Sequence, residues 1–249
     1  MLRMGSVAFL AGLAIAVVST IIHPTGTGEE LMNNPFIFAV YAEDDLWIAS
    51  HIGQFAGILL IYAGGFVALF RLLPRPESGT TVASALAWFG LVTAILTVSV
   101  FTILQAVDGI ALKIAVDTWY AIPSPPSSEA GDAGGGAEEG EKAIALRVAE
   151  GLRWTEWGIQ AYYRMLQGAV ALIFGVAIVK SSVLGRWIGA VGIAAGVVGI
   201  AAGVVVAYVG FSSVRDPVAD LSTLILYPWI VILGIFMWRK TRVKKLINR

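Results

Sequence analysis

The residues best suited to chemistry gather at one depth of an otherwise apolar chain. They are His23, His51, Gln54, Gln105 and Asp108, and they come from three apolar segments. His51 and Gln54 lie three residues apart, as do Gln105 and Asp108, so each pair would share one face of a helix. Two imidazoles with a carboxylate such as Asp108 or Glu156 would suit zinc, iron or manganese.

Two other interpretations of the histidines stay open. The simplest is that His23 and His51 are interfacial residues with no ligand role. Alternatively, the two imidazoles could together ligate a haem iron, because they sit at matching depths on consecutive antiparallel helices.

A second polar feature runs along one face of the fourth apolar helix. Its members are Arg153, Glu156, Gln160, Arg164 and Gln167, at spacings of three, four, four and three. Arg164 would lie about 6 Å below the outer boundary of the membrane. An arginine there is costly unless it faces the bundle interior and finds a partner. We expect that partner to be the carboxylate of Glu156 or Asp108, which would act as its counter-charge or as a proton-transfer group.

Together these residues predict an outward-facing polar pocket. Its ligand-binding candidates are Gln54, Gln105, Asp108, Glu156, Gln160 and Arg164, and its metal or haem candidates are His23 and His51. The alternatives are that Arg164 extends its side chain to the interface, or that the polar network only holds the outer segments in place.

The composition limits the chemistry further. The chain of 249 residues is 57% hydrophobic and 14% charged, and it has two histidines and no cysteine. Disulfides, thiolate metal sites and cysteine nucleophiles are therefore excluded. No nucleotide-binding loop, zincin motif, serine elbow or basic nucleic-acid patch is present, so we expect no nucleic-acid partner. The sequence does not decide whether the protein is an enzyme.

Six segments could position these residues by crossing a membrane. A spanning helix needs roughly 20 mostly apolar residues, and the segments are residues 4–22, 47–70, 82–104, 161–179, 187–213 and 221–238. The first is longer than the core of a signal peptide and ends without a small-residue cleavage site. The sequence therefore predicts an all-α bundle of six transmembrane helices, forming one integral membrane domain over residues 1–249.

Charge predicts the orientation of these helices in the cell membrane. If both termini are cytoplasmic, the inner segments hold 11 of the 17 basic residues and one of the 17 acidic residues, Glu77. Lysine and arginine near helix ends mark the cytoplasmic side. The basic tail that begins at Arg239 is explained by the same rule, with binding of anionic lipid as the alternative.

The outer segments differ in composition. Residues 24–46 are expected to form one loop. Residues 124–141 (SPPSSEAGDAGGGAEEGE) contain proline, glycine, serine and acids without large apolar residues, which is typical of a flexible linker. This linker would separate a helical extension of the third span, residues 108–120, from a helix that leads into the fourth.

Glycines form a seam on the fifth span. They are Gly185, Gly189, Gly192, Gly196, Gly199, Gly203 and Gly210, mostly at alternating spacings of four and three. Helices in lipid associate through close backbone approach at small residues. The seam predicts packing against a neighbouring helix of the same chain. The alternatives are a homodimer, or a partner in a membrane complex, bound through Gly185–Gly203.

Three stretches resemble a known group of proteins. YAEDDLWIASHIGQFAG, QAVDGIALKIAVDTW and RWTEWGIQAYYRMLQG are similar to segments of uncharacterised six-helix membrane proteins of bacteria and archaea, which are described as domains of unknown function. The likeness covers the spans and outer helices but not the linker. It implies a six-helix fold and no particular activity.

We therefore expect an integral membrane protein that binds a small ligand, a metal ion or haem in an outward-facing pocket. The alternative is an accessory subunit of a larger membrane complex, docked through the glycine seam. A transporter is the third possibility, disfavoured because polar residues become rare toward the inner half of the helices.

Overall fold

The computed structural model describes residues 1–24, 34–73, 81–123, 135–181 and 183–247, with the side chains of all of these except 135–138 and 242–247. These residues form helices and short connections, with no strand among them. In chain order the elements are α1 (Leu2–Ile21), α3 (Asn34–Ala42), α4 (Trp47–Leu59), η1 (Leu60–Phe66), α5 (Val67–Leu72), α6 (Val82–Gln105), η2 (Ala106–Leu112), α7 (Lys113–Ala121), α8 (Gly135–Ser181), α9 (Arg186–Val209) and α10 (Arg215–Ile247).

The predicted all-helical architecture is confirmed within these residues. Six helices are long and apolar enough to cross a membrane: Leu2–Ile21, Trp47–Leu72, Val82–Ala121, Glu139–Ser181, Arg186–Val209 and Arg215–Thr241. Two of them contain a π-helical turn, η1 in the second and η2 in the third, and the helix continues through each turn. The third span and its predicted extension are thus one uninterrupted helix.

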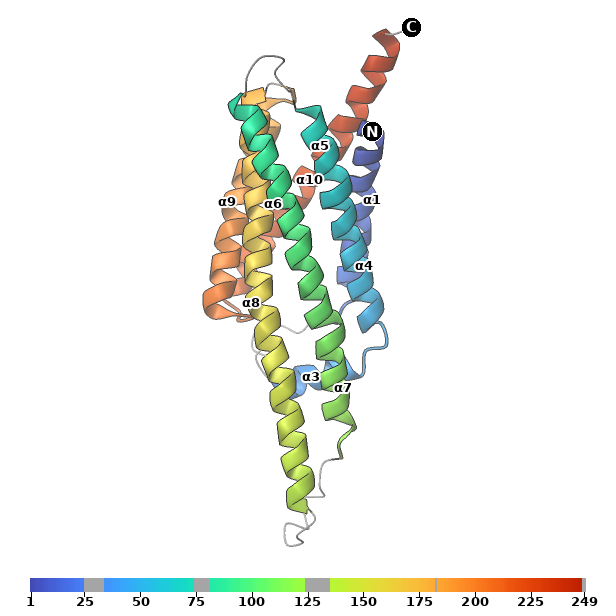
Figure 1. Ribbon diagram of the computed structural model, residues 1–249, viewed down its shortest axis with the longest axis vertical. Helices are drawn as coiled ribbons and strands as arrows, with labels where there is room; N and C mark the ends of the chain where they lie inside the picture. Colours follow the sequence, from blue (N-terminus) through green and yellow to red (C-terminus); the bar gives the residue numbers. More distant parts are fainter. Residues whose placement is uncertain (25–33, 74–80, 124–134, 182, 248–249) are drawn as a thin grey trace.

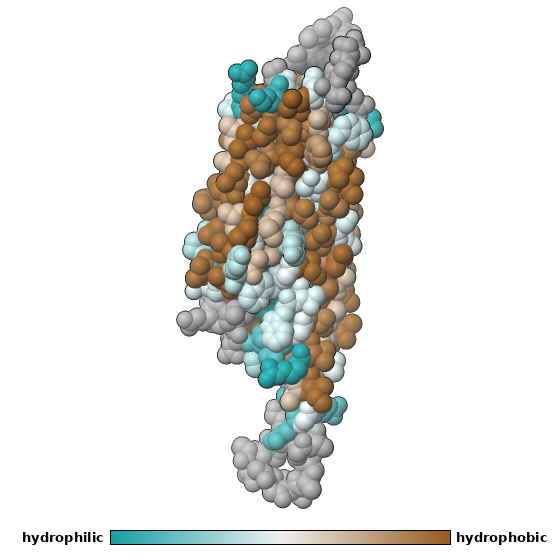
Figure 2. Space-filling model, turned by 60° about the vertical axis from the view of Figure 1, so that its left-hand side comes forward, coloured by the Kyte–Doolittle hydropathy of each residue, from teal (hydrophilic) through white to brown (hydrophobic). Residues whose placement is uncertain are grey.

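The bundle has two unlike ends (Figure 1). Both termini lie at one end, which we call the terminal end. At the opposite end, α7 and the first half of α8 project beyond the other helices, and α3 lies across them. Figure 2 shows hydrophobic residues over most of one flank, with hydrophilic residues at the terminal end and in the lower half. An apolar flank of this kind suits contact with lipid.

Two helix ends differ from the prediction, for reasons of local backbone chemistry. The fifth span was predicted to reach residue 213, but α9 ends at Val209 because Gly210 takes a left-handed conformation with φ of 63°. Glycine adopts that conformation without steric penalty and commonly ends helices. The sixth span was predicted to begin at residue 221, whereas α10 begins at Arg215 and so carries that arginine on the helix.

Two predicted loop regions also contain helix. The flexible linker was predicted over residues 124–141, but α8 begins at Gly135, so residues 135–141 are helical and 124–134 lie outside the described residues. Glutamate and alanine, which favour helices, are frequent there. The region 24–46 was predicted as a single loop, yet it contains α3, whose Ile37 and Phe38 are buried.

The glycine seam packs inside the chain. A Cβ on Gly196 would lie 2.5 Å from the backbone nitrogen of Leu172 on α8, and a Cβ on Gly203 would lie 2.7 Å from the backbone nitrogen of Met165 on the same helix. Gly192 instead lies against the buried indole of Trp229 on α10. This is the intramolecular packing that the sequence predicted, and it occupies the face considered for a partner.

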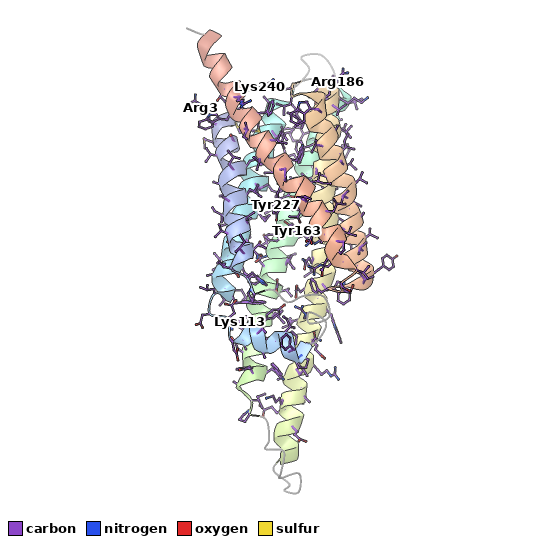
Figure 3. The ribbon with its side chains drawn as sticks, turned by 180° about the vertical axis from the view of Figure 1, so that it is seen from behind. Arg3, Lys113, Tyr163, Arg186, Tyr227 and Lys240 are labelled. Carbon is purple, nitrogen blue, oxygen red and sulfur yellow. The ribbon has the colours of Figure 1, made fainter. Side chains whose placement is uncertain are left out.

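The first and last spans meet at the terminal end. The Ser6 hydroxyl on α1 donates to the Gly234 carbonyl of α10 at 2.5 Å, and the Arg3 guanidinium donates to the Thr241 hydroxyl at 3.2 Å. Figure 3 shows α10 crossing away from α1 below this end, with Tyr163 and Tyr227 labelled between them.

An aromatic core fills the terminal half of the bundle. Phe66 lies at the centre of this core, with ring centroids 5.1 Å from Phe9, 5.1 Å from Phe174 and 6.0 Å from Trp229. The polar side chains described below therefore lie in the other half.

Candidate functional site

A cavity of about 500 Å³ lies between the helices in the half of the bundle away from the termini. Its wall is built from α1, α4, α6, η2, α8 and α10, with Tyr41 of α3 closing one side. Seven of the eight predicted site residues line it: His23, Gln54, Gln105, Asp108, Glu156, Gln160 and Arg164. The eighth, His51, lies behind Asp108. The spacing-based prediction thus named residues that share one cavity.

His51 is held by hydrogen bonds on both ring nitrogens. Its Nδ1 lies 2.7 Å from the Trp47 carbonyl oxygen one turn earlier on α4, and its Nε2 lies 3.1 Å from the Asp108 Oδ2 on η2. The ring is almost fully buried, with 2% of the side chain exposed. Gly109 makes this approach possible, because a Cβ there would lie 2.8 Å from the His51 Cβ. The Trp47 indole nitrogen donates to the Gly109 carbonyl at 3.1 Å, which ties η2 to α4.

These contacts restrict the charge state of the pair. A carbonyl oxygen only accepts, so the Nδ1 of His51 must carry a hydrogen. A neutral His51 then has a lone pair on Nε2, facing an Asp108 oxygen that is also an acceptor when ionised. The 3.1 Å contact between His51 Nε2 and Asp108 Oδ2 is favourable only if a proton or a positive charge lies between or beside these two atoms. An imidazolium or a protonated carboxyl would supply it, and so would a bound cation.

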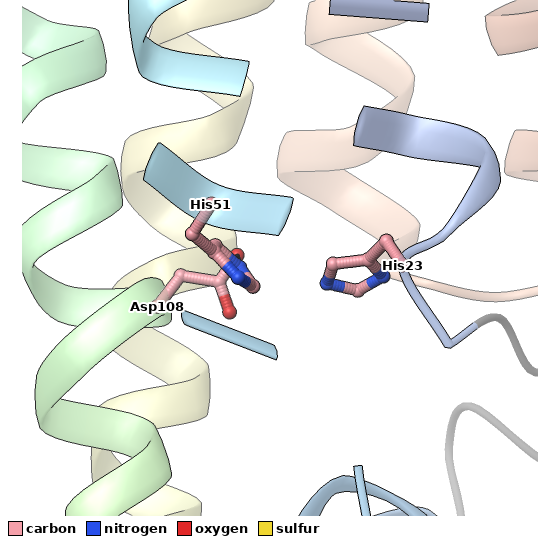
Figure 4. A group of neighbouring side chains, drawn as sticks. All are labelled: His23, His51 and Asp108. Atoms are coloured by element: carbon pink, nitrogen blue, oxygen red, sulfur yellow. Dashed lines mark hydrogen bonds and ion pairs between the residues drawn. The ribbon is translucent and has the colours of Figure 1, made fainter. Parts of the chain in front are cut away.

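His23 completes a group of three. It follows the end of α1, and its ring centroid lies 4.8 Å from those of both His51 and Trp47. Figure 4 shows His23 across a gap from the adjacent His51 and Asp108 side chains. One ligand atom from each residue falls within 4.8 Å of the others. Burial, with the nearby His51 as the next cause, lowers the pKa of His23 below its ordinary value, which favours the neutral, ligating form.

The group fits a small metal ion better than haem. Ligand atoms on a tetrahedral zinc ion lie about 3.3–3.6 Å apart, since each bond is about 2.0–2.2 Å long. A shift of about 1–1.5 Å would bring all three ligand atoms into that range. A haem bound by both histidines does not fit, because its porphyrin would have to pass between imidazoles whose ring centroids lie only 4.8 Å apart.

The predicted partner of Arg164 is wrong. Glu156 is paired with Arg153, one turn earlier on α8, at 3.4 Å, with only 5% and 6% of the two side chains exposed. Asp108 is engaged with His51. Both carboxylates expected for Arg164 are thus engaged with other side chains. The Nε of Arg164 and the Oε1 of Gln105 are buried without a hydrogen-bond partner among the described residues.

Several cavity residues were not among the predicted site residues. Tyr41 accepts a hydrogen bond from Arg153 at 3.0 Å, and burial raises the pKa of its phenol. Phe211 lines the cavity from the α9–α10 connection, and Arg215 lines it from the start of α10. Tyr41 was missed because its segment was taken for a loop, and Arg215 because the sixth span was started too late. Aromatic residues clustered at positions 36–41 were the available signal for the first.

The cavity therefore combines a histidine–carboxylate group on one wall with a cluster of arginines and amides on the other. It is large enough for a small molecule, since sites for such ligands usually measure about 300–1,000 Å³. Comparisons of this chain with protein-family models, with curated proteins and with solved structures found no match.

Proposed function

We propose that this chain is a multi-pass membrane protein that binds a divalent transition-metal ion through His23, His51 and Asp108, at the wall of a ligand-binding cavity. The observation that carries the proposal is the hydrogen bond from His51 Nδ1 to the Trp47 carbonyl. A histidine that binds metal through one nitrogen almost always donates its other N–H to a carbonyl or carboxylate. This contact leaves Nε2 directed toward Asp108 and His23.

The donor set indicates which ions would bind. Imidazole nitrogens with a carboxylate oxygen suit zinc, iron and manganese. Three protein ligands leave a position open on a four-coordinate ion, which is the arrangement of catalytic rather than structural sites. Since His23 and Asp108 also line the cavity, that position would be accessible to a molecule bound there.

We also infer that the cavity faces the outside of the cell. The excess of lysine and arginine at the terminal end supports cytoplasmic termini in the cell membrane. The cavity lies in the other half of the bundle, so metal and ligand would come from the outer side.

The chain is well suited to a test of the metal site. It has no cysteine and only two histidines, both in the proposed site, so the protein should be purified with a tag that contains no histidine. Elemental analysis should find one metal ion per chain. Cobalt added to chelator-washed protein should give visible absorption of a low-symmetry site, and His51→Gln or Asp108→Asn should abolish it.

Asp117→Asn is the matched control, since Asp117 is exposed and pairs with Lys113 on the adjoining α7. It should leave metal binding unchanged. The opposite result is also clear. If metal-free protein gains no stoichiometric ion, and nitrogen NMR finds His51 protonated on both nitrogens near pH 7, the group is an ion pair and the proposal is wrong.

A further inference from the structure

Arg164 is the least compensated charge in the cavity. It lies on α8 inside a membrane-spanning segment, and its Nε is buried without a hydrogen-bond partner. No carboxylate oxygen among the described residues forms an ion pair with it within 4.0 Å. A charge of this kind at membrane depth is expensive and commonly marks a functional site.

The surrounding charges do not neutralise it. Arg215, a second cation, and Asp220 line the same cavity from the first two turns of α10. Three acids line the cavity beside three arginines, but Glu156 is paired with Arg153 and Asp108 with His51. The cavity next to Arg164 is therefore suited to an oxyanion.

In the described part of the chain, Gln105, which is buried, is a second cavity residue with an unpaired polar atom. Its Oε1 has no hydrogen-bond partner among the described residues, and its side chain lines the cavity. A hydroxyl on the ligand headgroup, such as that of a phosphate monoester that keeps one proton, would donate a hydrogen bond to this acceptor. The cavity thus contains a cation, Arg164, and a hydrogen-bond acceptor, Gln105 Oε1, that a bound ligand could pair with.

The cavity also has an apolar side, and it opens between α1 and α10. Its apolar lining includes Val17, Ile21, Ile58, Phe101, Leu104 and Ala219. The lining residues that are also exposed are Thr20 and Ile21 of α1 and Asp220 of α10, with Ile21 75% exposed. These residues mark the opening. Among the described residues, Arg3 and Ser6 form hydrogen bonds from α1 to α10 at the terminal end, and the two helices diverge from there (Figure 3).

We propose that the cavity binds an amphipathic oxyanion, a carboxylate or phosphate headgroup on an aliphatic chain, which enters from the bilayer between α1 and α10. The headgroup binds Arg164 and Arg215, and the chain lies along the apolar residues of α1 toward the lipid. This deepens the proposed function by naming the ligand class of the same cavity, but it does not require the metal ion.

The test is equilibrium binding to chelator-washed protein in nanodiscs of phosphatidylcholine. The probes are a radiolabelled long-chain fatty acid, a lysophosphatidic acid and a monoacylglycerol with the same chain. Arg164→Gln should weaken binding of the two anions by about ten- to a hundredfold, the range expected for loss of a hydrogen bond to a charged group. It should leave the neutral probe unchanged, and Arg164→Lys should restore part of the affinity. The matched control is Arg147→Gln, an exposed arginine of the same helix.

A second pair of variants tests the route. Val17 lines the cavity, whereas its neighbour Val18 is 58% exposed on the outer surface of α1. Val17→Trp should reduce anion binding at least tenfold, and Val18→Trp should not. Far-UV circular dichroism and size-exclusion elution confirm that each variant is folded.

Each remaining outcome decides against a stated part of the proposal. If the neutral probe binds as tightly as the anions, or if Arg164→Gln changes nothing, the anion site is refuted. If acetate or inorganic phosphate competes as well as the long-chain probes, the ligand is a small free anion and the bilayer route is refuted. Whether the fatty acid or the lysophosphatidic acid binds more tightly identifies the headgroup. Because the protein is metal-free throughout, failure here is distinct from failure of the metal site.

Discussion

The packing of α8 on α9 can be tested with one chemical change made at two places. Gly196→Ala and Gly158→Ala both add a methyl group inside a helix. At Gly196 the methyl would lie 2.5 Å from the Leu172 nitrogen and 2.6 Å from its Cβ. At Gly158, which is exposed on α8, it would meet no atom within 4 Å.

The two substitutions should have opposite effects on stability. Carbon atoms pack at about 3.5–4.0 Å, so Gly196→Ala forces α8 and α9 apart by about 1 Å. Overpacking of this kind costs about 1–3 kcal/mol. Alanine also favours a helix over glycine by about 0.5–1 kcal/mol, and this gain is common to both variants. The difference between the two free energies of unfolding should therefore equal the overpacking term, about 1–3 kcal/mol.

The measurement is reversible unfolding in mixed micelles, extrapolated linearly to zero denaturing detergent. Far-UV circular dichroism checks that both variants keep the helical content of the parent. Equal stabilisation by the two substitutions would refute the reasoning, because the face of α9 that bears Gly196 would then not contact α8.

Three further predictions concern the site and the topology. Arg153→Ala should lower the free energy of unfolding by about 3–5 kcal/mol, because it leaves the buried Glu156 carboxylate unpaired. Arg153→Lys should recover part of that loss. Full stability of the alanine variant would contradict the buried ion pair. Burial lowers the pKa of His23 below 6.5, so between that lowered pKa and about 6.5 the unfolded chain binds one more proton than the folded chain. The free energy of unfolding of the metal-free protein should therefore decrease as the pH falls through this window and should level off below it. Thermal denaturation over a pH series measures this change. Since the chain has no cysteine, a membrane-impermeant maleimide on intact cells should label Ala143→Cys and not Thr241→Cys, and the reverse pattern would invert the orientation.

The spans were predictable because lipid imposes a simple requirement on length and polarity. About twenty consecutive apolar residues can be accommodated in few ways other than as a membrane helix. The number of predicted spans, six, agrees with the number of helices among the described residues that are long and apolar enough to cross a membrane. Their ends were less predictable. Gly210 belongs to the glycine pattern by spacing, yet it ends α9 through its left-handed backbone, and spacing contains no information about φ.

The site was predictable as a set of residues but not as a set of pairs. Helical spacing placed Glu156, Gln160 and Arg164 on one face of α8, and all three line the cavity. Their partners depend on distances between helices, which no spacing supplies. Arg153 lies one turn from Glu156 and forms the pair that had been expected for Arg164. Tyr41 lies far from both in sequence and was missed because its segment, α3, was predicted as a loop.

The closure of the bundle by its first and last helices has a consequence for biogenesis. The bond from Ser6 to the Gly234 carbonyl joins residues 228 positions apart. At synthesis rates of about 5–20 residues per second, α1 would wait roughly 10–45 s in the bilayer before α10 emerges. During that interval the small-residue face of α1 at Gly5 and Ser6 has no α10 to cover it, and it is open to chaperones or to mispairing. Chains truncated after α9 should therefore be recognised as incomplete and degraded, because α10 is the helix that covers this face of α1.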